Sequence, residues 1–207
     1  MRVLNAWVQS QIAHWAMIFG KNEIAADYWL RVAELKPRDP KPYTVAAHCK
    51  AELNRPQEAE VLLRKSLEVD PKFSAAWFNL GFLLQKREDH EQALSCFDAC
   101  IRVDEKMDRA HYGRALSLIA LNRQEEAKAA LQRTIDLQPM SPYGYYQLAS
   151  LHHRLGDDKS CITLVRKLHQ FEPQLAVQLQ KETGVLAGVT DPMDKYRPQV
   201  EVRGRQL

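Results

Sequence analysis

The chain has 207 residues, of which 45% are hydrophobic and 27% are charged, and its formal net charge is +3. It is therefore long enough to bury a sizeable core in one or two domains. Because lysines and arginines are scattered among aspartates and glutamates rather than massed, the composition gives no case for nucleic-acid binding. Four cysteines in a chain of this length do not make a disulfide framework, so we interpret them as free thiols of a reducing compartment.

The N-terminal segment, residues 1–21, is too polar for a secretion signal or a membrane-spanning helix. Asn5, Gln9, Ser10, Gln11 and His14 interrupt every apolar run in this segment. No other segment approaches eighteen consecutive apolar residues. We therefore expect a soluble, cytoplasmic protein with no membrane insertion.

Prolines recur along the chain at a regular spacing. The interval from Pro37 to Pro71 equals that from Pro139 to Pro173, and each proline ends a similar phrase: AELKP, LEVDP, IDLQP and HQFEP. The interval from Pro71 to Pro139 is twice as long, and the missing member falls at Glu105, in IRVDE. A fixed period of about 34 residues is typical of repeat proteins. It divides the chain into five repeats of equal length: 6–39, 40–73, 74–107, 108–141 and 142–175.

Each repeat is predicted to be a hairpin of two helices that cross closely. The eighth and twentieth positions of the repeats hold small residues: Ala13, Ala47, Gly81, Ala115, Ala149, and then Ala25, Ala59, Ala93, Ala127, Cys161. The twenty-fourth position holds a large residue: Trp29, Leu63, Phe97, Leu131, Val165. Small residues are needed at a crossing because a larger side chain would hold the two backbones apart. This explains Gly81, which costs about 1 kcal/mol against alanine in a helix interior.

The predicted turns inside the hairpins contain residues that suit a helix end. Gly20, Asn54, Asn122 and Gly156 fall between the two helices of their repeats. Glycine and asparagine tolerate a left-handed backbone at a helix end, which agrees with the predicted hairpins.

The pattern resembles the tetratricopeptide repeat over residues 6–175. The third repeat carries the motif best: Trp77, Leu80, Gly81, Leu84, Ala93, Phe97. The resemblance implies an all-α fold, a right-handed superhelical solenoid of helix-turn-helix hairpins. Arg114, Lys50 and His152 depart from the pattern, because each stands where a large apolar residue is expected.

Two segments follow the last repeat. Residues 174–184 have apolar side chains on one face and polar ones on the other, and we predict a C-terminal capping helix, because a terminal repeat needs a polar outer face. Residues 187–207 lose the periodicity and contain two prolines, which indicates a mobile tail.

No set of residues indicates catalysis, a metal site or a cofactor. His14 and His48 share the ninth position of adjacent repeats, but a zinc site needs three or four converging ligands. Cys96 and Cys100 lie on one helix face without a second pair, and we interpret them as small apolar residues. No Gly-rich phosphate loop or nucleophile motif is present. We expect a protein that is not an enzyme; an enzyme or metal protein that uses His14 and His48 is an alternative.

The resemblance implies that the first helices of the repeats line a concave channel. The side chains expected to form a partner-binding groove there are Phe78, Asn79, Phe82, Arg109, Tyr112, Tyr143 and Tyr146. Aromatic residues with an arginine are typical of binding hot spots. One subclass of the family binds the terminal carboxylate of a chaperone tail with lysine and asparagine side chains. Thr44, His48 and Gly113 stand at positions where that subclass would have lysine, asparagine and a further basic residue, so we do not expect this clamp. The alternative is that the rings pack within the stack or against the tail.

Two functions fit these features of the sequence. The first is a non-catalytic protein-interaction module, an adaptor or scaffold that binds a peptide or helix of a partner in the groove. The second is a structural subunit of a homo- or hetero-oligomeric assembly. The first repeat begins at residue 6, so we expect no helix to cap it and some of Trp7, Trp15, Ile18 and Phe19 to be uncovered. Such an apolar end can dock a partner or a second copy.

Overall fold

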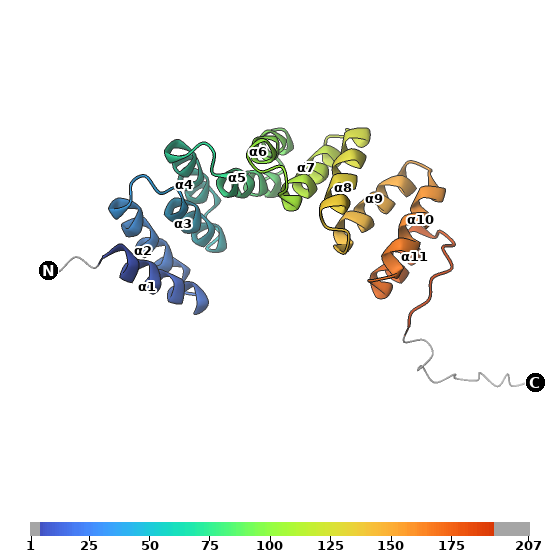
Figure 1. The fold of residues 1–207 in the computed structure, drawn as a ribbon, viewed down its shortest axis with the longest axis horizontal. Coiled ribbons are helices and arrows are strands. Elements are labelled where there is room, and N and C mark those ends of the chain that lie inside the picture. Colours follow the sequence, from blue (N-terminus) through green and yellow to red (C-terminus); the bar gives the residue numbers. More distant parts are fainter. Residues whose placement is uncertain (1–4, 193–207) are drawn as a thin grey trace, which may run out of the picture. The chain divides into compact units, whose positions relative to one another are not determined.

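The computed structural model describes residues 5–192. Over this range the chain forms α-helices joined by turns and contains no strand (Figure 1). The predicted all-α class is therefore confirmed. The chain divides into two units, an N-terminal unit, Met1–Ala130, and a C-terminal unit, Leu131–Leu207.

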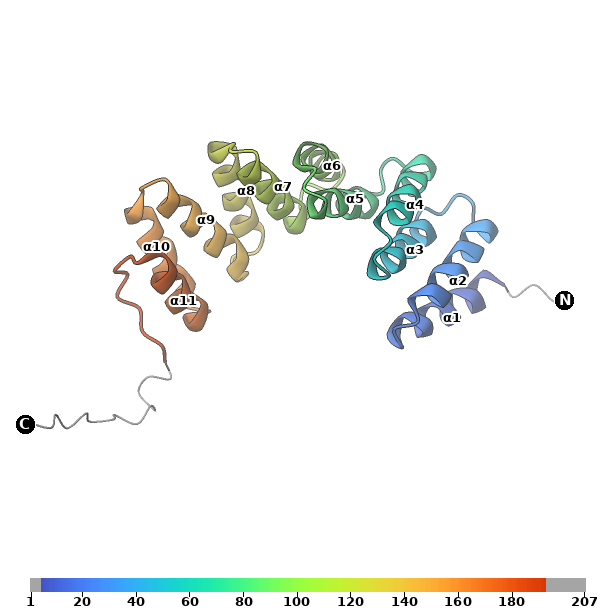
Figure 2. The same cartoon turned by 180° about the vertical axis from the view of Figure 1, so that it is seen from behind.

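The helices recur in pairs at the interval of the repeat. The N-terminal unit contains α1 (Ala6–Ile18), α2 (Asn22–Leu35), α3 (Lys41–Glu52), α4 (Pro56–Val69), α5 (Ser74–Lys86), α6 (His90–Val103), α7 (Asp108–Ala120) and the start of α8 (Gln124–Leu137). The C-terminal unit contains the end of α8, α9 (Pro142–Arg154), α10 (Asp158–His169) and α11 (Pro173–Thr183). Each helix from α1 to α6 packs against the next one in the chain, as Figures 1 and 2 show from two sides.

The turn inside each hairpin contains one residue in the left-handed backbone region. These residues are Gly20, Asn54, Glu88, Asn122 and Gly156, with φ of 68°, 58°, 63°, 59° and 78°. They recur at the repeat interval, so the fifteenth position of every repeat has the same backbone conformation. Glycine and asparagine adopt this conformation readily, whereas in glutamate the Cβ clashes with the backbone. Glu88 is therefore a strained residue in an exposed turn.

Replacing Glu88 by glycine should stabilise the protein. We expect Glu88→Gly to raise the free energy of unfolding by about 1 kcal/mol, because glycine reaches positive φ without a Cβ clash. Urea-induced unfolding followed by circular dichroism measures this change. Glu88→Ala is the control, because it removes the charge but keeps the Cβ. An equal gain in both variants would show that the charge, and not the backbone, is responsible.

The small and large positions of the repeat are buried. Every residue at the eighth, twentieth and twenty-fourth positions lies in the core. The reason for Gly81 differs in part from the prediction, since the atoms that a Cβ at Gly81 would meet belong to the Phe97 ring, the nearest at 2.9 Å, rather than to Ala93. A Cβ at Gly113 would meet the same ring at 2.5 Å. Phe97 therefore occupies space left by two glycines, one on α5 and one on α7.

Adding a methyl group at Gly113 should disturb this packing. We expect Gly113→Ala to lower the free energy of unfolding by about 1–3 kcal/mol, because the Cβ would overlap the fully buried Phe97 ring. In a Phe97→Leu background the same change should be much less harmful, since the smaller side chain leaves room. Thermal unfolding of the two single variants and the double variant measures this coupling. A Gly113→Ala protein as stable as wild type would contradict this account of the glycine.

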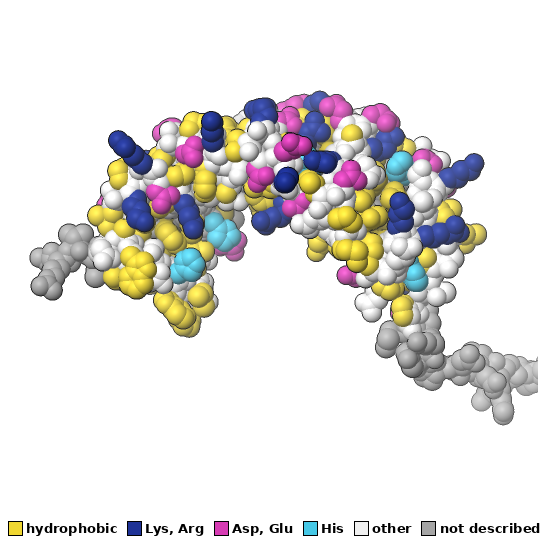
Figure 3. All heavy atoms as spheres, viewed as in Figure 1, with side chains coloured by type: hydrophobic (Ala, Val, Ile, Leu, Met, Phe, Trp, Pro, Cys, Tyr) yellow, Lys and Arg dark blue, Asp and Glu magenta, His cyan; other side chains and the backbone are white. Residues whose placement is uncertain are grey.

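The charged residues Lys50 and Arg114, which stand at apolar positions of the motif, are paired. Lys50 is only 7% exposed, and its Nζ lies 3.0 Å from Glu23 Oε1 and 3.3 Å from Glu58 Oε2. Burial alone would lower the pKa of Lys50, but the hydrogen bonds to these carboxylates raise it above its ordinary value. Arg114 likewise places Nε 2.7 Å from Asp98 Oδ1. On the face that Figure 3 shows, positive and negative side chains are interspersed in the same way.

The end of the C-terminal unit differs from the expected mobile tail. Helix α11 begins one residue before the predicted capping helix, and Gly184, whose φ is 70°, follows its last residue. Arg166 Nε donates to the Ala187 carbonyl oxygen at 2.9 Å, and Gln180 bonds both the N–H and the carbonyl of Val189. The first part of the segment, residues 187–190, thus packs on α10 and α11, because its backbone groups find side-chain partners there. Residues 193–207 of that segment lie outside the described residues.

In the part of the chain that the structure describes, no helix has both the length and the apolar surface that crossing a bilayer requires.

Candidate functional site

Two phenylalanines of α5 form the centre of the predicted site. Phe78 and Phe82 are four residues apart, so they share one face of the helix, and their rings stack with centroids 6.4 Å apart. The Phe78 ring also contacts Phe97, at 6.1 Å between centroids, and packs against the hydrophobic core. Phe82 is 47% exposed. The inner ring therefore belongs partly to the core, while the outer ring is available for contact with another molecule.

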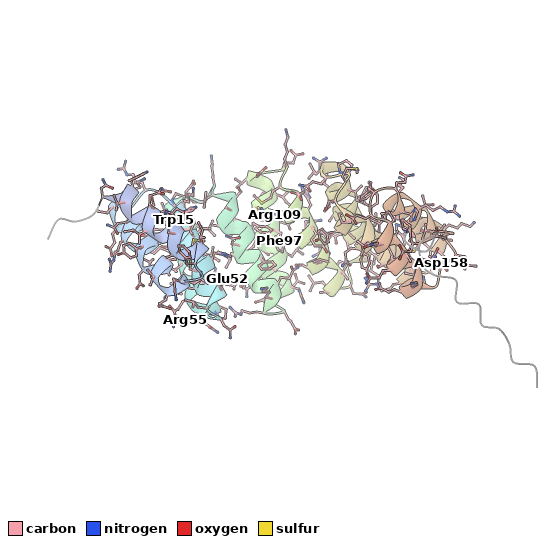
Figure 4. All side chains as sticks on the ribbon, turned by 90° about the horizontal axis from the view of Figure 1, so that it is seen from below. Trp15, Glu52, Arg55, Phe97, Arg109 and Asp158 are labelled. Carbon is pink, nitrogen blue, oxygen red and sulfur yellow. The ribbon has the colours of Figure 1, made fainter. Side chains whose placement is uncertain are left out.

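A cation lies against each of these rings. Lys86 Nζ is 4.8 Å from the Phe82 ring centroid, and Arg109 Cζ is 5.4 Å from that of Phe78. Figure 4 labels Arg109 beside Phe97. Neither cation forms an ion pair with any residue in the described range. The resulting row of Lys86, Phe82, Phe78 and Arg109, which we call the aromatic row, presents exposed positive charge at both ends.

A cavity of about 360 Å³ lies next to the aromatic row and is lined by residues of α3, α4 and α5. Its lining includes His48 and Ala51 from α3 and Asn79 and Phe82 from α5. Glu52, labelled in Figure 4, adds a carboxylate to the lining. The lining thus combines apolar surface with a few polar groups, which is typical of a site that holds a side chain of a ligand.

Helix α7 is fixed against α5 by an amide side chain. Gln85 Nε2 donates to the Gly113 carbonyl oxygen and to Ser117 Oγ, both at 2.9 Å. Arg109 and the half-buried Tyr112 lie three residues apart, on one face of α7. Of the predicted groove residues, the five on α5 and α7 therefore lie in the N-terminal unit, and contacts join Phe78 to Phe82 and Arg109.

The two remaining predicted residues, Tyr143 and Tyr146, belong to the C-terminal unit. Tyr143 is 64% exposed. The Tyr146 hydroxyl donates to a carboxylate oxygen of Glu182 on α11. This hydrogen bond raises the pKa of Tyr146 to about 12 and lowers the pKa of Glu182. Tyr146 therefore links α9 to the capping helix, whatever else its ring contacts.

The predicted set of groove residues leaves out Lys86 and every residue of α3. Lys86 is one turn beyond Phe82, and that spacing was a usable signal, since residues four apart share a helix face. On α3, His48 and Ala51 stand at the ninth and twelfth positions of their repeat, which the family resemblance places along the channel, although neither belongs to the predicted set. Glu52 had no such signal, and it lines the cavity because α3 lies beside α5 in the fold.

Within residues 5–192, no group of three or more histidine, cysteine or acidic side chains is arranged to hold a metal ion. All four cysteines are buried. Burial raises the pKa of Cys49, Cys96 and Cys100 to about 11. These thiols stay protonated at neutral pH, and a protonated, buried thiol is a poor nucleophile.

Family models described as tetratricopeptide repeat match residues 40–73, 62–95, 83–139 and 112–160. Together these stretches cover more than half of the chain. The chain belongs to the tetratricopeptide repeat family. Members of this family are protein-interaction scaffolds and are generally not catalytic.

One relative matches most of this chain at low sequence identity. Anaphase-promoting complex subunit 3 of Schizosaccharomyces pombe is 20% identical over 153 residues, which are 74% of this chain and 23% of that protein. This chain therefore spans less than a quarter of that relative's length.

Solved structures of tetratricopeptide repeat proteins have the same fold. MamA 41-end from Desulfovibrio magneticus RS-1 has a TM-score of 0.73 at 24% identity, covering 81% of this chain and 94% of that one. YrrB, described as a TPR protein with an unusual peptide-binding site, has a TM-score of 0.70 at 17% identity, covering 86% and 92%.

The hydrogen bond between Tyr146 and Glu182 should stabilise the tetratricopeptide repeat fold in a pH-dependent way. We expect Tyr146→Phe to lower the free energy of unfolding by about 1 kcal/mol at pH 8, because Glu182 loses this donor. The pKa of Tyr146 is raised from 10.0 to about 12, and that of Glu182 is lowered from 4.5. The stabilisation is therefore present between pH 4.5 and pH 10, and it is lost both as the pH falls through the lowered pKa of Glu182 and as the pH rises towards 12. The difference in the free energy of unfolding between wild type and variant should therefore narrow as the pH rises from 10 towards 12.

Urea unfolding at pH 8 and pH 11 measures both effects. Tyr43→Phe is the control, because among the described residues the only polar or ring contact of Tyr43 is that of its ring with Lys65. A Tyr146→Phe protein as stable as wild type at pH 8 would contradict the role assigned to the hydroxyl.

Proposed function

We propose that this chain is an adaptor that binds a short segment of a partner protein on the α3, α5 and α7 surface of its N-terminal unit. The observation that carries the proposal is the half-exposed Phe82 ring, which lines the cavity together with Lys86 and lies against the Lys86 ammonium group. Exposed aromatic side chains next to a pocket are typical of binding hot spots. The family supports a role in protein interaction, and YrrB is described as having a peptide-binding site.

The chemistry of the surface indicates the kind of segment that would bind. An apolar side chain of the ligand would fill the cavity against Phe82, and Asn79 would bond the ligand backbone. Lys86 and Arg109 favour acidic side chains at the two ends of the aromatic row, because each has an aromatic contact but no carboxylate partner among the described residues. An extended peptide or one face of an amphipathic helix would present these groups in sequence.

The surface is largely formed before a ligand arrives. Phe78 is anchored by Phe97, and Gln85 holds α5 to α7. Rigid side chains lose little conformational entropy on binding, so more of the contact energy appears as affinity. A dissociation constant near a micromolar, which corresponds to about −8 kcal/mol, would be ordinary for such a surface.

Tyr112, Tyr143 and Tyr146 complete the proposed set of contact residues. Tyr112 extends the surface along α7 from Arg109. Tyr143 offers an exposed ring on the C-terminal unit, and its contribution belongs to the proposal separately from the aromatic row. Tyr146 would contribute through its ring, because its hydroxyl is already bonded to Glu182.

Selection from a random peptide library tests the proposal and requires no assumption about the partner. We expect peptides selected on the wild-type protein to combine an apolar residue with acidic ones. Fluorescence anisotropy with a selected, labelled peptide should show at least a tenfold weaker affinity for Phe82→Ala/Arg109→Ala. Val61→Ala is the control, because Val61 is an exposed apolar residue on α4, away from the cavity lining.

The variants must be chosen so that binding and stability are separated. Phe78→Ala is a poor test, because its ring packs on Phe97 and its loss would disturb the core. Phe82 and Arg109 are exposed, so circular dichroism of the double variant should match wild type. Selected peptides that bind wild type and the double variant equally would overturn the assignment of this surface.

A further inference from the structure

Helix α1 exposes a row of large apolar side chains on one face. Trp7, Trp15, Ile18 and Phe19 are each more than half exposed, and Ile24 at the start of α2 is nearly so. The rings of Trp15 and Phe19 stack at 6.1 Å between centroids. Figure 3 shows hydrophobic side chains gathered at this end of the N-terminal unit, and Figure 4 labels Trp15. We call these five residues the α1 patch. Patches of this kind on a protein surface usually mark an interface.

The repeat frame shows what kind of surface this is. Trp15 is the tenth residue of its repeat, and the corresponding residues in the rest of the N-terminal unit, Cys49, Leu83 and Ser117, are all buried. Cys49 lies in one cluster with residues of α1 and α2, and Leu83 in one with residues of α4. The tenth position therefore faces the preceding hairpin. In α1 this packing position is exposed.

The size of Trp15 argues against a further hairpin at the usual spacing. Cys49, Leu83 and Ser117 are all smaller than tryptophan, and they allow consecutive hairpins to approach closely. An indole at this position would prevent a hairpin from approaching that closely, since inserting a larger side chain into a tight contact forces the backbones apart. Trp15 instead suits a contact between two separate molecules, because the cores of such interfaces are enriched in aromatic residues.

The charge of α1 favours a second copy of the same chain as the occupant. Its sequence, AWVQSQIAHWAMI, contains no lysine, arginine, aspartate or glutamate, whereas α2 to α7 all contain such residues. Two copies of this face can therefore lie together without like-charge repulsion, which is costly at most self-contacts. Gln11 on the same face can also donate and accept hydrogen bonds across the contact.

The exposed area is compatible with a stable contact between two copies. A full aromatic side chain buries about 150–250 Å², so the three partly exposed rings offer on the order of 400 Å² per copy. Two copies would bury roughly twice that area from the rings alone, and the two isoleucines and the polar rim bring the total towards the ~1,200 Å² of a small specific interface.

We propose that two copies of this chain associate through the α1 patch. The arrangement is two-fold, with the patch of one copy against the same patch of the other and Trp15 near the axis. This proposal is independent of the peptide-binding surface on α5 and α7, because the two sets of residues do not overlap. It makes the chain a dimeric adaptor, which would present two copies of the binding surface and so increase the avidity for a multivalent partner.

Sedimentation equilibrium from about 1 to 200 μM tests the proposal. We expect the wild-type chain to reach twice the 23.8 kDa mass of one chain within this range. Trp15→Glu and Trp15→Lys should each raise the dissociation constant of the dimer at least tenfold, because like charges then face each other across the axis. An equimolar mixture of the two variants should recover the dimer, because opposite charges then face each other. Val61→Glu is the matched control and should associate as wild type does.

Three results would overturn the proposal. The first is a wild-type chain that is still monomeric at about 200 μM, because dimers of ordinary affinity form well below that concentration. The second is a dimer whose dissociation constant is unchanged by Trp15→Glu. The third is a dimer whose dissociation constant Val61→Glu raises as much as Trp15→Glu does. If Trp15→Glu loses its helical circular dichroism signal, Ile18→Glu replaces it, since Ile18 is 66% exposed and has no core role.

Discussion

The N-terminal unit depends on the close approach of helices around Phe97. Its ring is fully buried and leaves no room for a Cβ at Gly81 or Gly113, so α5, α6 and α7 meet at one point. Dense packing of this kind fixes side-chain positions as well as backbones. Because Phe78 rests on Phe97, the core also determines where the aromatic row reaches the surface.

This link between core and surface shapes how the protein can bind. Phe78 contributes to both, Phe82 and Arg109 lie further out, and Lys86 adds a positive charge one turn along. In the C-terminal unit, Tyr146 likewise has both a structural and a surface position, since it lies at the surface and bonds Glu182 on α11. A hairpin that buries one face of its first helix must expose the other, so recognition residues arise at fixed intervals along the chain.

The departures from the repeat have local physical explanations. Lys50 and Arg114 occupy apolar positions because carboxylates on neighbouring helices pair with them. Glu88 adopts the left-handed backbone conformation that glycine or asparagine adopts in the other turns, because the hairpin geometry requires it. Trp15 stands at a packing position that its own repeat leaves uncovered. Each exception either has a partner, carries strain or offers a surface.

The sequence by itself determined the repeat frame, the helix pairs, the buried small and large positions and most turn conformations. These features are periodic and local, so an alignment of the chain with itself at the repeat interval contains them. Only the tertiary structure decided that Phe97 lies against Gly113, that α3 lies beside α5 at the candidate site, that Tyr146 bonds Glu182, and that residues 187–190 pack on α10 and α11. Such contacts join side chains far apart in sequence, and their partners depend on which helix faces come together, which no local pattern specifies.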